Sequence, residues 1–524
     1  MNAVLRHSAV AALLLCAAAC TVGPNYEVPK DAAINNPNAA GSLTTASGKE
    51  VSDADVPPNW WRLYDDDTLN QLVQDALRSN TDLRVAAANI ARASFATEAA
   101  QAAGGFSGKT GAAVLRAQES GEAYLLTEKV PVVTEGDFGI SVSYQFDLFG
   151  LIRRGVEAAS DDQQAVLAAA DVARITVVAD VVRSYVENCA AGDELNVAQH
   201  SLDLQNQSLA LTKRLRDAGR ANEPEVTRSQ TQTATLRADI PRYTARKRVA
   251  LYRLAMLTGR APNELPANVG TCDKLPRLTQ PIPVGDGAAL LKRRPDIREA
   301  DRKLASATAR IGVATAALYP NVSFGASAGF TGVLQDIPQA PTARWNFGPL
   351  VSWNFPVNGQ RQRVQEAQAS ASGALASFDG VVLNALRETE SSLANYSSDL
   401  AREDELKAAQ TSARKSADET HRFYLAGRQS SLADLDAQRT LASVDGQVAG
   451  AEAQVSLDQV NLFLSLGGGW EQDSATSQAG VAQGASAAAM TVPASANPAS
   501  GTGVAAVAPA SPEQAASGAT AAAR

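Results

Sequence analysis

The sequence predicts a mainly α-helical chain with a membrane β-barrel. It is built as two tandem repeats, each with two barrel strands and a long α-helical hairpin. Three observations lead to this fold class. The chain repeats its own pattern at offsets of 208 to 214 residues. Each half contains segments in which apolar and polar residues alternate, and each half also contains a proline-free stretch of more than sixty residues.

Composition favours long helices over several compact enzyme cores. Of 524 residues, 5% are aromatic and 19% are charged, and alanine is the commonest of the residues in the 45% counted as hydrophobic. Alanine suits helices that pack closely along long seams. The net charge of −8 argues against a nucleic-acid-binding surface, which needs clustered Lys and Arg. We find no catalytic, phosphate-binding or metal-ligand motif, so we expect no enzyme, no cofactor and no metal.

The first residues have the pattern of an export signal. Arg6 and His7 precede an apolar run from Ala9 to Ala19, which has the length of a signal-peptide core and is too short for a membrane helix. We therefore expect residues 1–19 to be a signal peptide. The small residues before Cys20 resemble a lipobox, so we predict lipidation of Cys20. The alternative is an ordinary secretory signal that leaves this cysteine unmodified.

Two segments have few of the large apolar residues that a hydrophobic core requires. Residues 20–59 are rich in Pro, Asn, Gly, Ser and Thr and are interpreted as a lipidated N-terminal tether. Residues 471–524 consist mostly of Ala, Ser, Gly and Pro, so we expect a disordered tail.

Between these segments we place a first repeat at residues 60–260 and a second at 288–470, joined by a proline-rich connector at 261–287. Short motifs recur in the two repeats in nearly constant register. The corresponding pairs are Asn80-Thr81-Asp82-Leu83 with Arg294-Pro295-Asp296-Ile297, Phe149-Gly150 with Asn358-Gly359, and Arg216-Asp217-Ala218-Gly219-Arg220 with Tyr424-Leu425-Ala426-Gly427-Arg428.

Alternating segments predict the strands. In the first repeat, Phe138, Ile140 and Val142 alternate with small or polar residues, which puts the apolar set on one face. A half-buried strand of a soluble sandwich would show the same pattern. No later stretch approaches 18 consecutive apolar residues, so we assign membrane crossing to strands. The expected strands are at about 106–118, 137–147, 320–331 and 345–356.

Four strands are too few to close a barrel, since the smallest closed barrels have about 8 strands. The fold therefore requires further copies of the chain, and three copies would supply twelve strands.

The proline-free stretches predict helical rods. The stretch from Gly155 to Gly219 would form a rod of about 95 Å at a rise of 1.5 Å per residue. The second repeat has its counterpart from Gly359 to Gly427. Each rod ends at a glycine followed by a helix-capping signal, which predicts a sharp hairpin between antiparallel helices. The two capping signals are Asn222 with Glu225 and Ser431 with Asp434.

Several motifs resemble those of the TolC-type outer-membrane efflux factors, in the lipoprotein branch often called NodT-like. The resemblance covers nearly all of residues 20–470. It rests on Cys20-Thr21-Val22-Gly23-Pro24-Asn25-Tyr26, Pro58-Asn59-Trp60-Trp61, Phe146-Asp147-Leu148-Phe149-Gly150, Leu290-Leu291-Lys292-Arg293-Arg294-Pro295-Asp296-Ile297, Ala309-Arg310-Ile311-Gly312-Val313-Ala314, Leu318-Tyr319-Pro320 and Leu466-Gly467-Gly468-Gly469-Trp470.

The resemblance implies a homotrimer whose 12-stranded β-barrel lies in the outer membrane, in contact with its lipid, and continues as an α-helical barrel into the periplasm. It also implies a periplasmic adaptor protein and an inner-membrane efflux pump as partners, with drugs or other small molecules as cargo. The hairpin residues Gly219, Arg220, Gly427 and Arg428 would then contact the adaptor. An alternative is a structural, non-conducting lipoprotein scaffold. A periplasmic hydrolase would need a catalytic cluster, which we do not find.

The resemblance further implies a periplasmic gate in the second hairpin. Asp436 falls on the acidic position of the family's constriction, and Asp434 stands beside it with Leu435 between them. The alternative is that these carboxylates only stabilise their helix, because they interact favourably with the positive N-terminal end of the helix dipole.

The cysteines Cys189 and Cys272 fall on a predicted helix and in the connector. An exported protein can form a disulfide between them. Two separate buried thiols would be equally compatible with the sequence, because spacing along the chain does not give the distance between them.

Overall fold

The computed structural model of the chain describes residues 21–39, 41, 43, 50–118, 120, 122, 125, 127–278 and 280–468. The chain divides into two compact units, Met1–Glu471 and Gln472–Arg524, and all of the described residues belong to the first unit. The predicted signal peptide, Cys20 and the tail at 471–524 lie outside the described residues.

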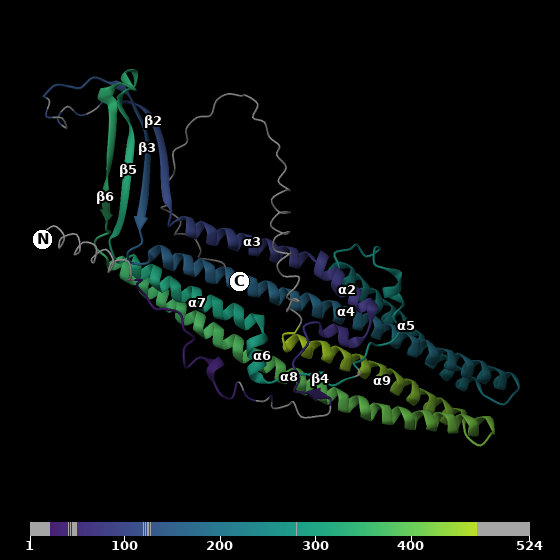
Figure 1. The fold of residues 1–524 in the computed structure, drawn as a ribbon. Helices are drawn as coiled ribbons and strands as arrows, with labels where there is room; N and C mark the ends of the chain where they lie inside the picture. Colours follow the sequence, from purple (N-terminus) through teal and green to yellow (C-terminus); the bar gives the residue numbers. More distant parts are fainter. Residues whose placement is uncertain are drawn as a thin grey trace, which may run out of the picture. The chain divides into compact units, whose positions relative to one another are not determined.

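Four strands form one antiparallel sheet in the order β2-β3-β5-β6 (Figure 1). The strands are β2 (Phe106–Ala117), β3 (Val133–Phe146), β5 (Asn321–Val333) and β6 (Ala343–Ser352). Two strand ends differ from the positions that alternation predicted. β3 begins at Val133, because its first residues pair with the end of β2. β6 ends at Ser352, because its partner β5 begins at Asn321 and offers no further backbone for pairing.

The register places aromatic side chains together on one face of the sheet. Tyr144 pairs with Phe106 on one side and with Phe324 on the other. The opposite face carries mostly small and polar residues, with exceptions such as Leu115 and Leu350, and Ser141 there pairs with Lys109 and Ser327. Because side chains alternate between the faces of a strand, a one-residue slip would exchange the two faces.

Each repeat contains a helix pair, then a strand pair, then a long helical hairpin. The helix pairs ahead of the strands were not predicted. The first repeat contains α2 (Asp67–Ser79), α3 (Thr81–Ala102), α4 (Leu151–Asp217) and α5 (Glu223–Leu257). The second contains α6 (Gly287–Arg293), α7 (Pro295–Ala316), α8 (Asn358–Leu425) and α9 (Ser431–Ser465).

The two longest helices have nearly equal lengths. Helix α4 has 67 residues and α8 has 68, so each is about 100 Å long at 1.5 Å per residue. α4 packs against α5 and α7, while α8 packs against α9 and α7. The helices of the described residues are not long and apolar enough to cross a membrane.

The segment that composition indicates as a tether is attached to the helical body in its described part. Strand β1 (Val51–Ser52) pairs in parallel with β4 (Ile282–Pro283) in the connector. The backbone N–H of Ala33 donates a hydrogen bond of 2.7 Å to Asp379 of α8. These contacts join the described N-terminal segment to the connector and to α8, both of which are distant from it in sequence.

The main hydrophobic core lies around the middle of α4, where α2, α9 and the connector meet it. Trp60, in the 3-10 helix η2 (Trp60–Tyr64), stacks on Phe463 of α9 with ring centroids 4.6 Å apart. Val178, Val182 and Val186 of α4 are fully buried in this core. The β-branched residues therefore lie where α4 is covered on several sides.

Candidate functional site

The two edges of the sheet are free to pair with further strands. β2 and β6 form the edges, and each has a neighbour on one side only within the described sheet. An edge strand presents unpaired N–H and C=O groups that another chain can bind. Pro349 lies in β6, where a residue without an N–H is tolerated because the strand is at an edge.

The apolar face of the sheet is exposed. Phe106 is 79% exposed, and Trp345 and Phe347 are 74% and 68% exposed. Exposed aromatic residues in such number mark a surface that contacts apolar material or another protein. The structure therefore has one apolar face, one polar face and two open edges.

The two hairpins end in the same way. Gly219 and Gly427 follow α4 and α8 in the left-handed conformation, with φ values of +67° and +69°. The N–H groups of Arg220 and Arg428 then close the ends by donating to Leu215 and Phe423, at 2.7 and 2.8 Å. This 6→1 hydrogen bond is typical of a Schellman motif, in which a glycine ends the helix.

The next helix of each hairpin begins with a side-chain cap. Asn222 accepts from the N–H of Glu225, as the sequence predicted. In the second hairpin the cap is Ser430, which accepts from the N–H of Ala433, and not Ser431. The prediction was one residue late because two serines are adjacent and either could start the helix.

The three predicted gate residues differ in their surroundings. Asp434 is 2% exposed, whereas Asp436 is exposed and Leu435 is half-buried. Both carboxylate oxygens of Asp434 lie 3.2 Å from Nδ1 of His421 in α8, and Gln438 donates a 3.0 Å hydrogen bond to one of them. Residues two positions apart on a helix point about 200° apart, so Asp434 and Asp436 cannot share one face.

Polar residues gather where the second hairpin faces the first. A groove of about 340 Å³ lies between α4, α5, α8 and α9. Gln205 and Gln232 of the first hairpin line it, together with His421 and Gln438 of the second. Near Asp434, burial together with the charges of Asp434 and Glu225 raises the pKa of Tyr424. The groove between the hairpins thus has a mixed lining, because its polar side chains lie among Leu204, Leu211, Leu236 and Leu441.

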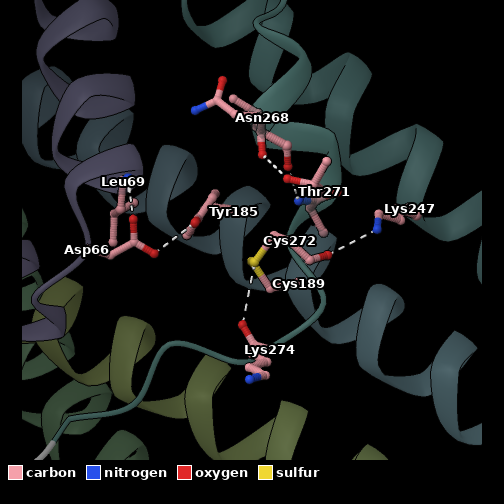
Figure 2. The surroundings of a disulfide bond; sticks show 11 residues. Asp66, Leu69, Tyr185, Cys189, Lys247, Asn268, Thr271, Cys272 and Lys274 are labelled. Atoms are coloured by element: carbon pink, nitrogen blue, oxygen red, sulfur yellow. Dashed lines mark hydrogen bonds between the residues drawn. A yellow bond between two sulfur atoms is a disulfide. The ribbon is translucent and has the colours of Figure 1, made fainter.

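A disulfide joins Cys189 of α4 to Cys272, which follows the 3-10 helix η4 (Ala267–Thr271) in the connector (Figure 2). The carbonyl oxygen of Cys272 also accepts a 3.0 Å hydrogen bond from Lys247 of α5. A Cβ atom at Gly192 would collide with the same carbonyl, so the connector approaches α4 where a side chain is lacking. The bond attaches the connector to the first hairpin.

Sequence reasoning assigned no role to Arg294, which is a buried connection between three helices. Arg294 is 7% exposed, and its guanidinium donates to both carboxylate oxygens of Asp296, at 3.0 and 2.7 Å. It also donates to Glu388 of α8 at 2.9 Å and to the carbonyl of Ser465 in α9 at 2.7 Å. An arginine directly before a helix-starting proline was the available signal, but spacing alone does not reveal its distant partners.

Arg154 of α4 holds the described N-terminal segment in a similar way. It is 3% exposed and donates to the carbonyls of Val22 and Gly23 and to Asn25. Its side chain lies over Gly312 of α7, where a Cβ atom would collide with it. The chain just after the predicted lipidation residue is therefore fixed beside the strand-to-helix corner. Cys20 itself lies outside the described residues.

In the described part of the chain, no group of three or more His, Cys, Asp and Glu side chains is placed to hold a metal ion.

Comparison with known proteins relates this architecture to one family. The family model described as outer membrane efflux protein matches residues 72–260 and 288–468, which include the long hairpins of both repeats. Nodulation protein T of Rhizobium leguminosarum bv. viciae is 27% identical over 463 residues, covering 88% of this chain and 93% of that protein. The toluene efflux pump outer membrane protein TtgF of Pseudomonas putida is 28% identical, covering 89% of this chain and 97% of that protein.

Among solved structures, the outer-membrane channel OprN matches with a TM-score of 0.79 and 33% identity. The match covers 86% of this chain and 100% of that chain. The likeness confirms the predicted fold class of tandem repeats that are mainly helical.

Proposed function

This chain belongs to the outer membrane efflux protein family, and from that membership we propose that it is the exit duct of a tripartite efflux system. In this proposal it forms a homotrimer in the cell outer membrane and extends into the periplasm. A periplasmic adaptor protein and an inner-membrane efflux pump deliver drugs or other small molecules to it. The relative named as a toluene efflux pump component supports a small organic cargo.

The open sheet carries most of this proposal. Its two free edges need partners, its exposed aromatic face suits lipid, and its polar face suits a wet lumen. Four strands from each of three copies would close a barrel of twelve. The hairpin ends at Gly219, Arg220, Gly427 and Arg428 are then the surface that we propose for the adaptor.

We assign the periplasmic gate to Asp436 and Leu435. The exposed carboxylate of Asp436 is free to face a lumen, and three copies around an axis would hold cations. The buried carboxylate of Asp434 in α9 faces His421 in α8, so we propose that it stabilises the packing of these two helices at the end of the hairpin. Lipidation at Cys20 would anchor the trimer.

Measurement of single-channel conductance tests directly whether the protein forms an export channel. We expect purified protein in planar lipid bilayers to show single-channel currents, and multivalent cations added on the periplasmic side to block them. Asp436→Ala should weaken that block and leave trimer stability nearly unchanged. Asp404→Ala changes an exposed carboxylate of α8 about 20 residues before the end of that helix, and this control should keep the block. A trimer that inserts but passes no current would favour the non-conducting scaffold.

A further inference from the structure

Helices α8 and α9 bring two carboxylates together away from the hairpin end. Asp458 of α9 is 5% exposed. One of its oxygens accepts a 2.9 Å hydrogen bond from Gln454 on the same helix. The other oxygen is buried and has no hydrogen-bond donor in the described structure. Asp399 of α8 lies within hydrogen-bonding reach of this carboxyl group.

Two ionised carboxylates cannot satisfy each other, because both are acceptors and both are negative. A single proton placed between them removes the repulsion and supplies the missing donor. Burial, together with the Asp399 hydrogen bond, raises the pKa of Asp458 to about 6. The orphaned oxygen and the facing carboxylate therefore require the same bound proton.

The other groups near this pair leave Asp458 without a compensating cation. Arg402 of α8 lies 4.0 Å from Asp399 but is mostly exposed, so water screens its charge. Arg183 of α4 donates to Asn461 at 2.9 Å. Tyr64 donates to Gln459, the residue next to Asp458. The surroundings of Asp458 thus favour its neutral form.

We propose that Asp399 and Asp458 share one proton, and that this proton locks α9 against α8 in a pH-dependent way. The proposal goes beyond the exit-duct function and does not depend on it. It concerns the packing of the second hairpin, and it makes that packing weaker as the medium becomes less acidic.

The direction in which stability changes with pH follows from proton linkage. The folded chain binds this proton more tightly than the unfolded chain does, because the pKa of Asp458 is raised on folding. The stabilisation is complete below the ordinary pKa of about 4. It declines as the pH rises towards about 6, and it is absent above that.

Unfolding of the full-length, detergent-solubilised protein tests the proposal. We expect the denaturant midpoint, followed by circular dichroism, to fall as the pH is raised from about 4.5 to 7. Asp458→Asn keeps an acceptor for Gln454 and adds an N–H₂ donor towards Asp399, so the fall should shrink strongly. The matched control is Asp445→Asn, also in α9, whose carboxylate is paired with Gln410 and Arg414 and should leave the fall intact. An undiminished fall in Asp458→Asn would overturn the proposal.

Two further measurements keep the result interpretable. If Asp458→Asn does not fold, Asp399→Asn supplies the same donor from the other helix and should likewise flatten the pH dependence. Infrared spectroscopy at pH 5 should show a protonated carboxyl band that both variants lack. If Mg²⁺ or Ca²⁺ raises the midpoint at pH 7.5 in the unmodified protein but not in Asp458→Asn, the pair binds a metal cation and the shared proton is the wrong occupant.

Discussion

Buried arginines connect parts of this chain that are distant in sequence. The guanidinium of Arg294 joins the start of α7 to Glu388 in α8 and to the end of α9 at Ser465. Its planar donors satisfy a carboxylate, a second carboxylate and a carbonyl at once, which a lysine ammonium cannot do in this geometry. Such a residue holds helices in one arrangement, because each partner loses a charged donor when the arginine is removed.

We therefore expect Arg294→Ala to lower the free energy of unfolding by about 2 to 3 kcal/mol, because it removes charge-assisted hydrogen bonds from carboxylates that are 30% and 38% exposed and can be rehydrated. Arg310→Ala removes an exposed ion pair with Asp162 and should cost less than about 1 kcal/mol. Chemical unfolding followed by circular dichroism measures both. Equal losses in the two variants would contradict the role assigned to Arg294.

At the scale of the element, the hairpins depend on glycine conformation. Gly427 has a positive φ value and open space around it, so an added methyl group would strain only the backbone. Gly446 lies inside α9 and also has open space around it. We expect Gly427→Ala to destabilise the protein by about 1 kcal/mol and Gly446→Ala to stabilise it by a similar amount. Thermal unfolding of the two variants checks the prediction, and effects of the same sign would contradict it.

The disulfide acts on the connector between the repeats. It closes a loop of 83 residues, and the chain-entropy model then gives a stabilisation of about 4 to 5 kcal/mol. We expect Cys272→Ser to lose most of this stability. Cys189→Ser should lose a similar amount, and the double variant should be no worse than either. A reducing agent should destabilise the unmodified protein but leave the double variant unchanged.

At the scale of the whole molecule, the open edges of the described sheet support the proposed assembly of three copies. We expect the detergent-solubilised protein to have the mass of three copies in light-scattering measurements. A folded monomer would contradict the proposed trimer, because β2 and β6 would then keep their unpaired edges.

Lipid attachment at Cys20 is a prediction from the sequence and is tested separately. Cys16, the other cysteine near the N-terminus, lies within the predicted signal peptide and supplies the control. Metabolic labelling with palmitate should mark the unmodified protein and Cys16→Ser, but not Cys20→Ser. Mass spectrometry of the mature N-terminus would locate the modification. Label that survives Cys20→Ser would rule out lipidation at this residue.

The sequence by itself determined the features that depend on local periodicity. Alternation along Phe138, Ile140 and Val142 indicated the two faces of a strand, because side chains alternate with a period of two. The absence of proline from long stretches indicated the rods, and the glycines at 219 and 427 indicated their ends. The recurrence of motifs in nearly constant register indicated the duplication.

Only the tertiary structure decided which distant residues meet. Arg294 and Glu388 are separated by 94 residues, and nothing in their spacing predicts that they form a pair. The sequence left the pairing of Cys189 with Cys272 open, because a disulfide depends on a distance in space. Asp434 and Asp436 have the same chemistry in the sequence, and they differ because packing against His421 buries one and leaves the other exposed.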